Sequence, residues 1–464
     1  MARSVAIAKN NPRDLRLVTV GQGVSLIGDS ITQLALPLMA VDLLGADSLG
    51  TGFLGAASTL AYLFIGLQAG VWVDRSSRRA YLLAADLARV VLLLTIPVAY
   101  LLNVLTLPLL IAMQVGLGAA TVFFNVAWPA YLPRLASGVT LLKLNARMAI
   151  MGEGAGFVGP GLAGALIGIF SAPFVMVVDA VTFAISYVSL RAIRTPEPPS
   201  PKRRNSLLHD LKEGLRALWV RPNLRLITFE GVNGNIAYGI MIGQAIIFQR
   251  IDLGFEPALI GAVASAGFLG GFLGSISAPY LVKRVGFGKL LIIGTALFGL
   301  NEFLLPLAAF VPRELAPLFS IANFFIGGYF LLIYIVPVTT YRQQAVPDRL
   351  LGRVMSINRT LAWGFGATLG FVLGGLLGNA FGRPNALIVG AVLQTVIPIV
   401  IFGYARIWRY PTIESAAKFD NRAAAPLPGW LAARCAGDLV AHGGYLSAAA
   451  AARLSNFAAD SIVG

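Results

Sequence analysis

Among the carboxylates inside the long apolar runs of this sequence, two are candidates for proton chemistry. Asp29 lies near the middle of the run 17–41, and Glu153 lies in the run 143–169. An ionised carboxylate at the centre of a membrane-spanning helix costs about 2.5–3.5 kcal/mol on insertion scales. Asp29 should therefore face a wet cavity, pair with a cation, or take up a proton. We name Asp29 and Glu153 as candidate proton-coupling residues. The alternatives are hydrogen bonds from neighbouring Ser and Thr side chains for Asp29, and a buried salt bridge for Glu153.

A short charged hinge separates two of the apolar runs. Residues 70–79 read Gly-Val-Trp-Val-Asp-Arg-Ser-Ser-Arg-Arg. So short a loop between two spanning helices has to turn within the headgroup region. Arginines can face anionic lipid there. Asp86 and Arg89 follow three residues apart and can form an intrahelical pair. We predict a gate at this end of the helices, formed by Gly70, Asp74, Arg75, Arg78, Arg79, Asp86 and Arg89. The alternatives are a basic membrane anchor for the hinge and a purely structural role for the pair.

The elements that position these residues are predicted to be membrane-spanning helices. The 464 residues are 57% hydrophobic and only 12% charged, whereas soluble domains are about a quarter charged. A spanning helix needs about 20 mainly apolar residues. Runs of that length cover 17–41, 50–70, 80–101, 105–127, 143–169, 174–193, 225–249, 257–281, 289–311, 315–341, 355–380 and 385–408. We therefore predict an all-α polytopic membrane protein with twelve transmembrane helices.

The basic residues predict the orientation of these helices. A net charge of +15 would suggest nucleic-acid binding in a soluble chain, but here the Lys and Arg residues gather in loops. One set of loops, which includes the charged hinge, holds most of them, whereas the opposite set holds only Arg250, Arg313 and Arg383. The positive-inside rule then places both termini in the cytoplasm. We expect a bacterial inner-membrane protein that contacts lipid headgroups and binds no nucleic acid.

A linker divides the chain into two halves. Its proline-rich start, 195–201, reads as an extended spacer, and an amphipathic helix that can lie on the inner leaflet follows. The segment 156–164 recurs as 370–378 with a similar glycine pattern, which indicates a parallel repeat. We predict an N-terminal six-helix bundle (1–193), a cytoplasmic linker (194–224), a C-terminal six-helix bundle (225–410) and an alanine-rich cytoplasmic tail (411–464). A regulatory role for the linker is an alternative to a surface anchor.

Several motifs resemble the major facilitator superfamily. The hinge is similar to that family's loop Gly-x-x-x-Asp-Arg-x-Gly-Arg-Arg, with Ser77 in place of the second glycine. The run after Glu153 resembles the fifth helix of its antiporters and keeps Gly159, Pro160 and Gly164. The segment 347–356, Pro-Asp-x-x-x-Gly-Arg-Val-x-Ser, is similar to the branch that contains the enterobactin exporter and macrolide efflux proteins, the transmembrane secretion effectors. The resemblance implies two six-helix halves that rock around a central site near mid-membrane.

The same resemblance assigns places to other polar residues. It puts Asp179 and Glu302 on peripheral helices, so we expect structural roles for them. It lines the central cavity with the first, fourth, seventh and tenth helices, whose amide and phenol groups on apolar walls suit an amphipathic organic molecule better than a small ion. The candidate cavity residues are Gln33, Asn125, Asn233, Tyr238 and Tyr334. Each could instead form a hydrogen bond between helices.

We interpret the chain as a secondary transporter that exports an amphipathic small molecule, such as a drug or siderophore, in exchange for protons. The hinge would latch the cytoplasmic side closed in the outward-open state. The carrier would act as a monomer, with membrane lipids, the substrate and protons as its partners. A nutrient uptake symporter or facilitator is the alternative, and a transport-inactive sensor or scaffold is a further one.

Enzymatic function is the least favoured class. The sequence has one cysteine, Cys435, and two histidines, His209 and His442, all outside the apolar runs. This scarcity argues against a Cys-based metal cluster and against a Ser-His-Asp site in the membrane. No Gly-x-x-x-x-Gly-Lys-Ser/Thr segment for ATP binding occurs. We therefore expect neither an enzyme nor a cofactor.

Overall fold

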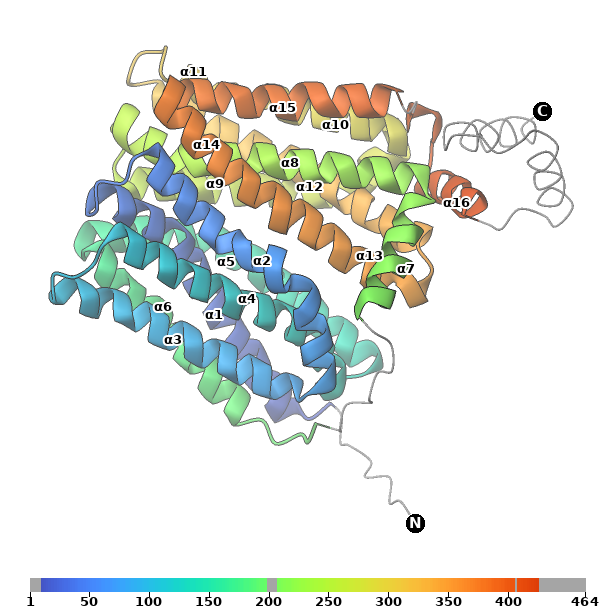
Figure 1. The fold of residues 1–464 in the computed structure, drawn as a ribbon, viewed down its shortest axis with the longest axis horizontal. Coiled ribbons are helices and arrows are strands. Elements are labelled where there is room, and N and C mark those ends of the chain that lie inside the picture. The colour runs from blue at the N-terminus through green and yellow to red at the C-terminus, as the bar shows by residue number, and fades with distance from the viewer. Residues whose placement is uncertain (1–9, 198–206, 405–406, 425–464) are drawn as a thin grey trace, which may run out of the picture.

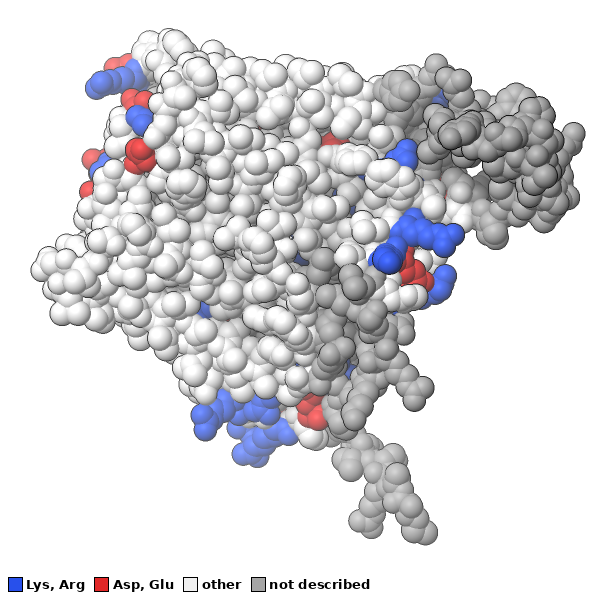
Figure 2. Space-filling view, in the orientation of Figure 1, with Lys and Arg blue, Asp and Glu red and all other residues white. Residues whose placement is uncertain are grey.

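The protein is described here by a computed structural model that covers residues 10–197, 207–404 and 407–424. Within these ranges the chain forms helices and no strands, and twelve helical stretches are long and apolar enough to cross a membrane. The prediction of an all-α polytopic membrane protein is thus confirmed. Charged side chains gather at the two ends of the helices and leave the visible side between them almost uncharged (Figure 2).

The N-terminal half consists of six single helices. They are α1 (Pro12–Asp42), α2 (Ser48–Arg75), α3 (Arg78–Leu101), α4 (Leu107–Leu135), α5 (Gly138–Ile169) and α6 (Ala172–Arg191). α4 continues beyond its predicted end at 127, through Pro129 and Pro133. Proline is tolerated inside membrane helices because neighbouring groups satisfy the carbonyls that it frees. Within this half, α1 packs against α5 and α6, and α3 packs against α4 and α6.

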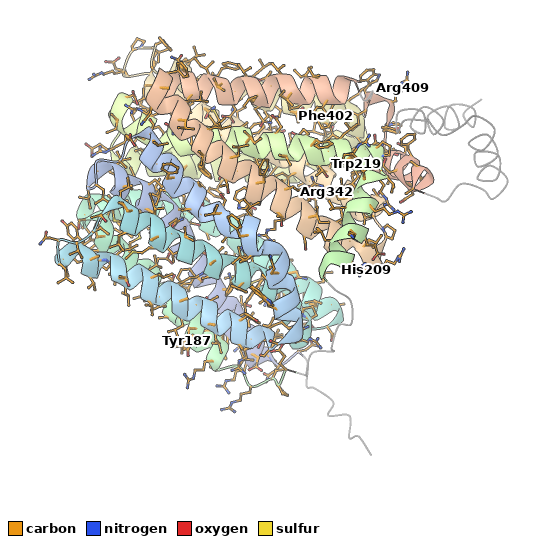
Figure 3. All side chains as sticks on the ribbon, in the orientation of Figure 1. Tyr187, His209, Trp219, Arg342, Phe402 and Arg409 are labelled. Atoms are coloured by element: carbon orange, nitrogen blue, oxygen red, sulfur yellow. The ribbon has the colours of Figure 1, made fainter. Side chains whose placement is uncertain are left out.

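The C-terminal half follows the linker helix α7 (Leu207–Trp219), whose labelled residues His209 and Trp219 lie beside this half (Figure 3). Two of its spans contain π-helical segments, and one span ends in a separate short helix. The spans are α8–η1 (Pro222–Ile247, Phe248–Asp252), α9 (Pro257–Val285), α10 with α11 (Phe287–Asn301, Leu304–Leu307), α12 (Ala316–Ala345), α13–η2–α14 (Asp348–Arg359, Thr360–Ala367, Thr368–Phe381) and α15 (Arg383–Tyr404). The short η3 (Ile407–Arg409) and α16 (Ile413–Ala423) follow the last span.

The two halves lie side by side, and each begins and ends on the same side of the molecule (Figure 1). α1 begins, α6 ends, α8 begins and α15 ends on the same side, which we call the terminal end. The loops 43–47 and 253–256 lie on the opposite side, which we call the far end. The halves meet through α2 with α14 and through α5 with α9.

The contact between the halves is tightest toward the far end. A Cβ atom on Gly164 of α5 would lie 2.4 Å from the carbonyl oxygen of Pro257, so only glycine permits this approach. Toward the terminal end, a Cβ on Gly152 or Gly154 would meet no other residue within 4 Å, and Glu153 between them is exposed. α5 therefore contacts the other half near the far end and leaves it toward the terminal end.

α16 packs against α8 and α12 at the terminal end of the C-terminal half. The carboxylate of Asp420 accepts hydrogen bonds from the backbone N–H groups of Asn223 (3.0 Å) and Leu224 (2.9 Å), at the start of α8. The Tyr341 hydroxyl on α12 donates to the same carboxylate. A residue that follows the last span thus caps the first helix of this half, since the first N–H groups of a helix have no partner within the helix.

We expect Asp420→Ala to lower the thermal unfolding midpoint of the detergent-purified protein, because it leaves the first N–H groups of α8 without an acceptor. Loss of such a cap costs about 1–2 kcal/mol. Glu414→Gln is the control, because its partner Lys418 lies in the same helix and the pair is exposed. Equal unfolding midpoints for Asp420→Ala and the control would show that the Asp420 cap adds no stability.

Candidate functional site

A buried carboxyl cluster lies between α1, α3 and α6. Asp179 on α6 is 1% exposed and accepts hydrogen bonds from Thr32 on α1 and from Thr182, the latter at 2.9 Å. It lies so close to α1 that a Cβ on Gly28 would be 2.1 Å from its Oδ1 atom. Glycine at position 28 thus makes room for this carboxylate beside Asp29. Asp179 thus points into its own half from α6, which packs mainly against α1, α3 and α5 among the described helices. Its structural role stays a prediction.

Asp86 and Arg89 on α3 complete the cluster. They form the predicted intrahelical pair, with 3.6 Å between Asp86 Oδ1 and Arg89 Nη1, and Asp86 also accepts from Ser186 on α6 at 2.7 Å. The Arg89 guanidinium lies between the rings of Phe124 and Phe183, 4.7 Å from each centroid. The pair is thus enclosed in the N-terminal half by α4 and α6. Its role in a gate stays a prediction.

Asp29 differs from the other members of the cluster because it is half-buried. It forms no hydrogen bond or salt bridge within the described residues, and the cation that acts on it electrostatically is Arg89. The neighbouring Ser30 hydroxyl donates to the Leu26 carbonyl instead. The alternative of a locally hydrogen-bonded Asp29 is therefore not what the structure contains.

Glu153 lies apart from this cluster, on the exposed side of α5. It shares a helical face with Phe157, Pro160 and Gly164, at spacings of four, three and four residues. Farther along α5 this face meets α9. Glu153 therefore points toward the other half at the level where the two halves have separated. It forms no ion pair in the described part of the chain, so the buried salt bridge is absent there.

The charged hinge is bound to its own half. Glu197, at the start of the linker, accepts hydrogen bonds from the Ser77 hydroxyl (2.6 Å) and from the backbone N–H groups of Arg78 (2.9 Å) and Arg79 (3.2 Å). Arg79 in turn donates to the carbonyl of Arg191, at the end of α6, at 2.8 Å. The hinge therefore ties α3 to α6 and to the linker.

Ser77 explains why the hinge does not need its second glycine. The residue begins α3 as its N-cap with an extended backbone conformation, and its side chain accepts from the Ala80 N–H. Serine suits this position better than glycine does. A Cβ on Gly70 would meet no atom within 4 Å, and the side chains of Asp74 and Arg75 lie outside the described residues.

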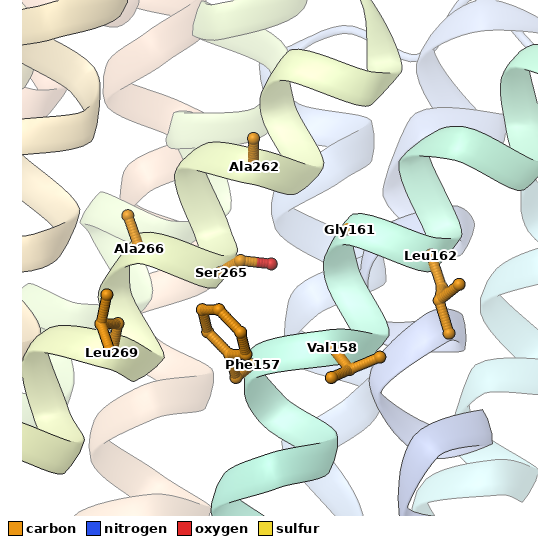
Figure 4. Close-up of a pocket in the computed structure, with 8 residues that line it drawn as sticks. All are labelled: Phe157, Val158, Gly161, Leu162, Ala262, Ser265, Ala266 and Leu269. Atoms are coloured by element: carbon orange, nitrogen blue, oxygen red, sulfur yellow. The ribbon is translucent and has the colours of Figure 1, made fainter.

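The antiporter-like residues of α5 hold helices close together. A Cβ on Gly159 would lie 2.3 Å from the Ser30 Cβ of α1, and Gly164 meets α9 as described above. Pro160 lies buried inside the helix. Next to them, a largely apolar groove of about 530 Å³ lies along the contact of α5 with α9, with Phe157 and Leu162 from α5 and Ala262 and Leu269 from α9 among its lining residues (Figure 4). The link between these residues and export direction stays a prediction.

One predicted cavity residue takes part in a contact between the halves. Asn125 on α4 donates to the Tyr62 hydroxyl at 2.7 Å. Arg359, at the end of α13 in the other half, donates to the same hydroxyl at 3.2 Å, and its guanidinium lies 4.9 Å from the Tyr62 ring centroid. Gln33 is exposed on α1. The sequence does not predict this role of Tyr62, since nothing in its local pattern indicates a partner in the other half.

The remaining cavity candidates contact neighbouring helices. Asn233 donates to the Leu393 carbonyl of α15 at 3.1 Å, and the Tyr334 hydroxyl on α12 donates to Glu230 on α8. Arg342, labelled in Figure 3, lies two turns farther along α12 toward the terminal end. Tyr238 packs against the Trp363 ring, with 5.4 Å between the centroids. Each group is engaged with protein, which leaves its contact with a substrate as a prediction.

A set of polar contacts, the far-end latch, joins the halves at the far end. Arg250 lies 2.8 Å from Asp42, and Asn379 donates to Asp47 at 2.7 Å. The hydrogen bonds from Asn379 and from the Gly50 N–H lower the pKa of Asp47 below its ordinary value. The ionised Asp47 therefore stabilises the latch at neutral pH, and this contribution is lost only as the pH falls through its lowered pKa.

Comparisons with known proteins point to one family. The family model described as Major Facilitator Superfamily matches residues 18–362 and 232–462. The multidrug efflux pump Tap of Mycolicibacterium fortuitum is 27% identical over 412 residues, which cover 84% of this chain and 95% of that protein. Among solved structures, a mutant of the nucleoside transporter NupG has a TM-score of 0.70 at 13% identity and covers 84% of this chain and 99% of that one.

A second solved structure is similar to almost the whole chain. It is a bacterial homologue of the human lysosomal transporter Spinster, in an inward-facing and unoccupied conformation. Its TM-score is 0.65 at 14% identity, and the match covers 91% of this chain and 100% of that one. At such identities the two structures support the fold alone.

We expect Arg250→Gln to loosen the far-end latch. Loss of a partly exposed ion pair costs about 0.4–1 kcal/mol, which corresponds to a two- to fivefold shift in a two-state equilibrium. The measurement is the rate at which a thiol reagent labels a cysteine introduced at Ala56, which is buried between the halves, in a Cys435→Ser background. Arg383→Gln is the matched control, because its partner Asp252 belongs to the same half. Labelling of Arg250→Gln at the control rate would contradict a latch role.

Proposed function

Because the chain belongs to the Major Facilitator Superfamily, we propose that it is a secondary transporter that exports an amphipathic small molecule in exchange for protons. The observation that carries this proposal is Asp29, a half-buried carboxyl group in the middle of a spanning helix with no hydrogen bond or salt bridge among the described residues. Such a group is costly to keep in an apolar bundle and suits reversible proton binding. It lies beside Arg89 and two further carboxyl groups.

The direction and the substrate class rest on separate arguments. The similarity to the multidrug efflux pump Tap favours export. Aromatic and amide groups among apolar helices, such as Trp363 and Gln33, favour a molecule with both apolar and polar parts, for example a drug or a siderophore-like compound. The likeness to a nucleoside transporter concerns the fold and does not favour uptake.

The arrangement of the halves fits one state of an alternating-access cycle. With the terminal end in the cytoplasm, as the positive-inside rule predicts, the far-end latch closes the outer side, and the face of α5 that carries Glu153 is accessible from within. Outward opening would require Arg250 to leave Asp42 and the halves to approach each other at the hinge. The hinge, now bound to Glu197, would be free to contact the other half only in that second state.

In this mechanism, protonation of Asp29 on the outer side is coupled to release of the substrate, and loss of the proton to the cytoplasm accompanies the return. Glu153 is the second candidate for proton exchange, because it faces the space between the halves. The protein's contribution is to expose Asp29 to one side at a time. No bond other than that to the proton is made or broken.

We expect Asp29→Asn to lower the rate of compound-driven proton exchange at least tenfold, because an amide cannot bind and release the proton. Everted membrane vesicles acidified inside, with a pH-sensitive dye in the lumen, are exposed in turn to macrolides, cationic dyes and siderophores. Compounds that the protein exports should make the lumen more alkaline, and Asp29→Asn should remove this response. Glu153→Gln tests the second candidate in the same assay.

The matched control is Glu302→Gln, which alters another half-buried carboxyl group within a spanning stretch, one that lies 3.5 Å from the Asn323 amide. It should keep the response. A normal response in Asp29→Asn vesicles would show that Asp29 carries no coupled proton. Lumenal acidification on addition of a compound, with protons and the compound entering the lumen together, would identify a symporter and replace export by uptake.

A further inference from the structure

We propose that Asp179 is a second proton-binding residue, and that Asp29 and Asp179 form a carboxyl pair that holds one exchangeable proton beside Arg89. This inference rests on the proton antiport proposed above and adds to it a residue that the sequence predicts to be structural. It follows from four features of the cluster between α1, α3 and α6.

The first feature is the position of Asp179 against α1. Its carboxylate lies beside Gly28, where a Cβ would be 2.1 Å from Oδ1, and it accepts a hydrogen bond from Thr32. These two residues flank Asp29, one before it and the other three after it. At 100° per residue, Asp29 lies 100° around the helix from Gly28 and 60° from Thr32. The two carboxyl groups therefore occur at the same level and on adjoining faces.

The second feature is the balance of charge. From α3, Asp86 and Arg89 face the pair, and from α5 the acid Glu153 lies on the face directed toward α9. Three carboxylates thus surround one guanidinium, and full ionisation would leave two negative charges uncompensated in an apolar interior. An uncompensated buried charge is strongly destabilising, and neighbouring carboxyl groups relieve such repulsion by sharing a proton.

The third feature is unused hydrogen-bonding capacity. Asp86 Oδ1 and Arg89 Nε have no hydrogen-bond partner within the described residues, although Asp86 is 0% and Arg89 is 2% exposed. The rings of Phe124 and Phe183 lie on the guanidinium and hold it in place. Arg89 thus keeps a donor for a carboxylate that has lost its proton. No group of acidic, His or Cys residues in the described ranges fits a metal ion, which favours a proton as the bound species.

The fourth feature is unequal access. Asp29 is half-buried, whereas Asp179 is 1% exposed and bound by two threonine hydroxyls. Asp29 therefore exchanges the proton with water, and Asp179 exchanges it with Asp29. When the proton leaves, the carboxylate that remains is stabilised by Arg89. Because Asp179 and Arg89 belong to α6 and α3, the protonation state of the pair acts on the packing of three helices.

The test needs no substrate, because the proton itself is the probe. Infrared spectra of the purified full chain, recorded across a pH series, report the carbonyl band of protonated carboxyl groups. We expect Asp179→Asn and Asp29→Asn each to remove part of this band and to shift the titration midpoint of the other group by about one pH unit or more. The double variant should then lose less of the carbonyl band than the two single variants lose together.

Two controls keep the result interpretable. Glu302→Gln removes a half-buried carboxyl group in the other half and should leave the midpoints of the pair unchanged. Thr182→Val removes a hydrogen bond to Asp179 without altering the charge, and it should shift the same midpoint even if Asp179→Asn fails to fold. The proposed pair would be overturned if the titration midpoints stayed unchanged in every variant. It would also be overturned if the band losses of the two single variants simply added in the double variant.

The outcomes separate this inference from the proposed function. Coupled titration without compound-driven proton exchange in vesicles would support the pair and overturn the antiport. Compound-driven exchange with independent titration of Asp29 and Asp179 would support the antiport and overturn the pair.

Discussion

The free-energy cost of placing charge in an apolar interior governs the N-terminal half. A single guanidinium, that of Arg89, is packed between two aromatic rings and surrounded by three carboxyl groups from three helices. Such a set persists only where the surrounding hydroxyls and the cation satisfy it. α1, α3 and α6 therefore depend on one another for more than apolar packing, and any change in the charge of the cluster alters the contacts among all three.

The two ends of the interface between the halves are stabilised by different physical means. Toward the far end, glycines let backbones approach directly, and short polar contacts such as Asp42 with Arg250 reinforce this closure. Toward the terminal end, polar groups are satisfied mostly within their own half, as with Glu197 at the hinge and Asp420 at α8. Tyr62 and Arg359 are an exception, since they join the halves. This division suits halves that separate at one end while staying rigid internally.

The sequence predicts what depends on local pattern. Hydrophobic length is enough to find twelve spans, and a spacing of three residues is enough to pair Asp86 with Arg89. It does not predict contacts that depend on which helices become neighbours. Asp179 meets Thr32 across 147 positions of the chain, and the partner of the hinge, Glu197, lies in a proline-rich segment with no signal of its own. The cap that Ser77 provides could have been found, because serine before a helical run is a known N-cap signal.

The bond between Asp420 and the start of α8 bears on how the protein is made. Asp420 lies 197 positions after Asn223, which it caps, so ribosomal synthesis produces the helix long before it produces the carboxylate. During insertion, the first N–H groups of α8 must rely on water or lipid headgroups at the membrane surface. The C-terminal half is therefore complete only once α16 has docked.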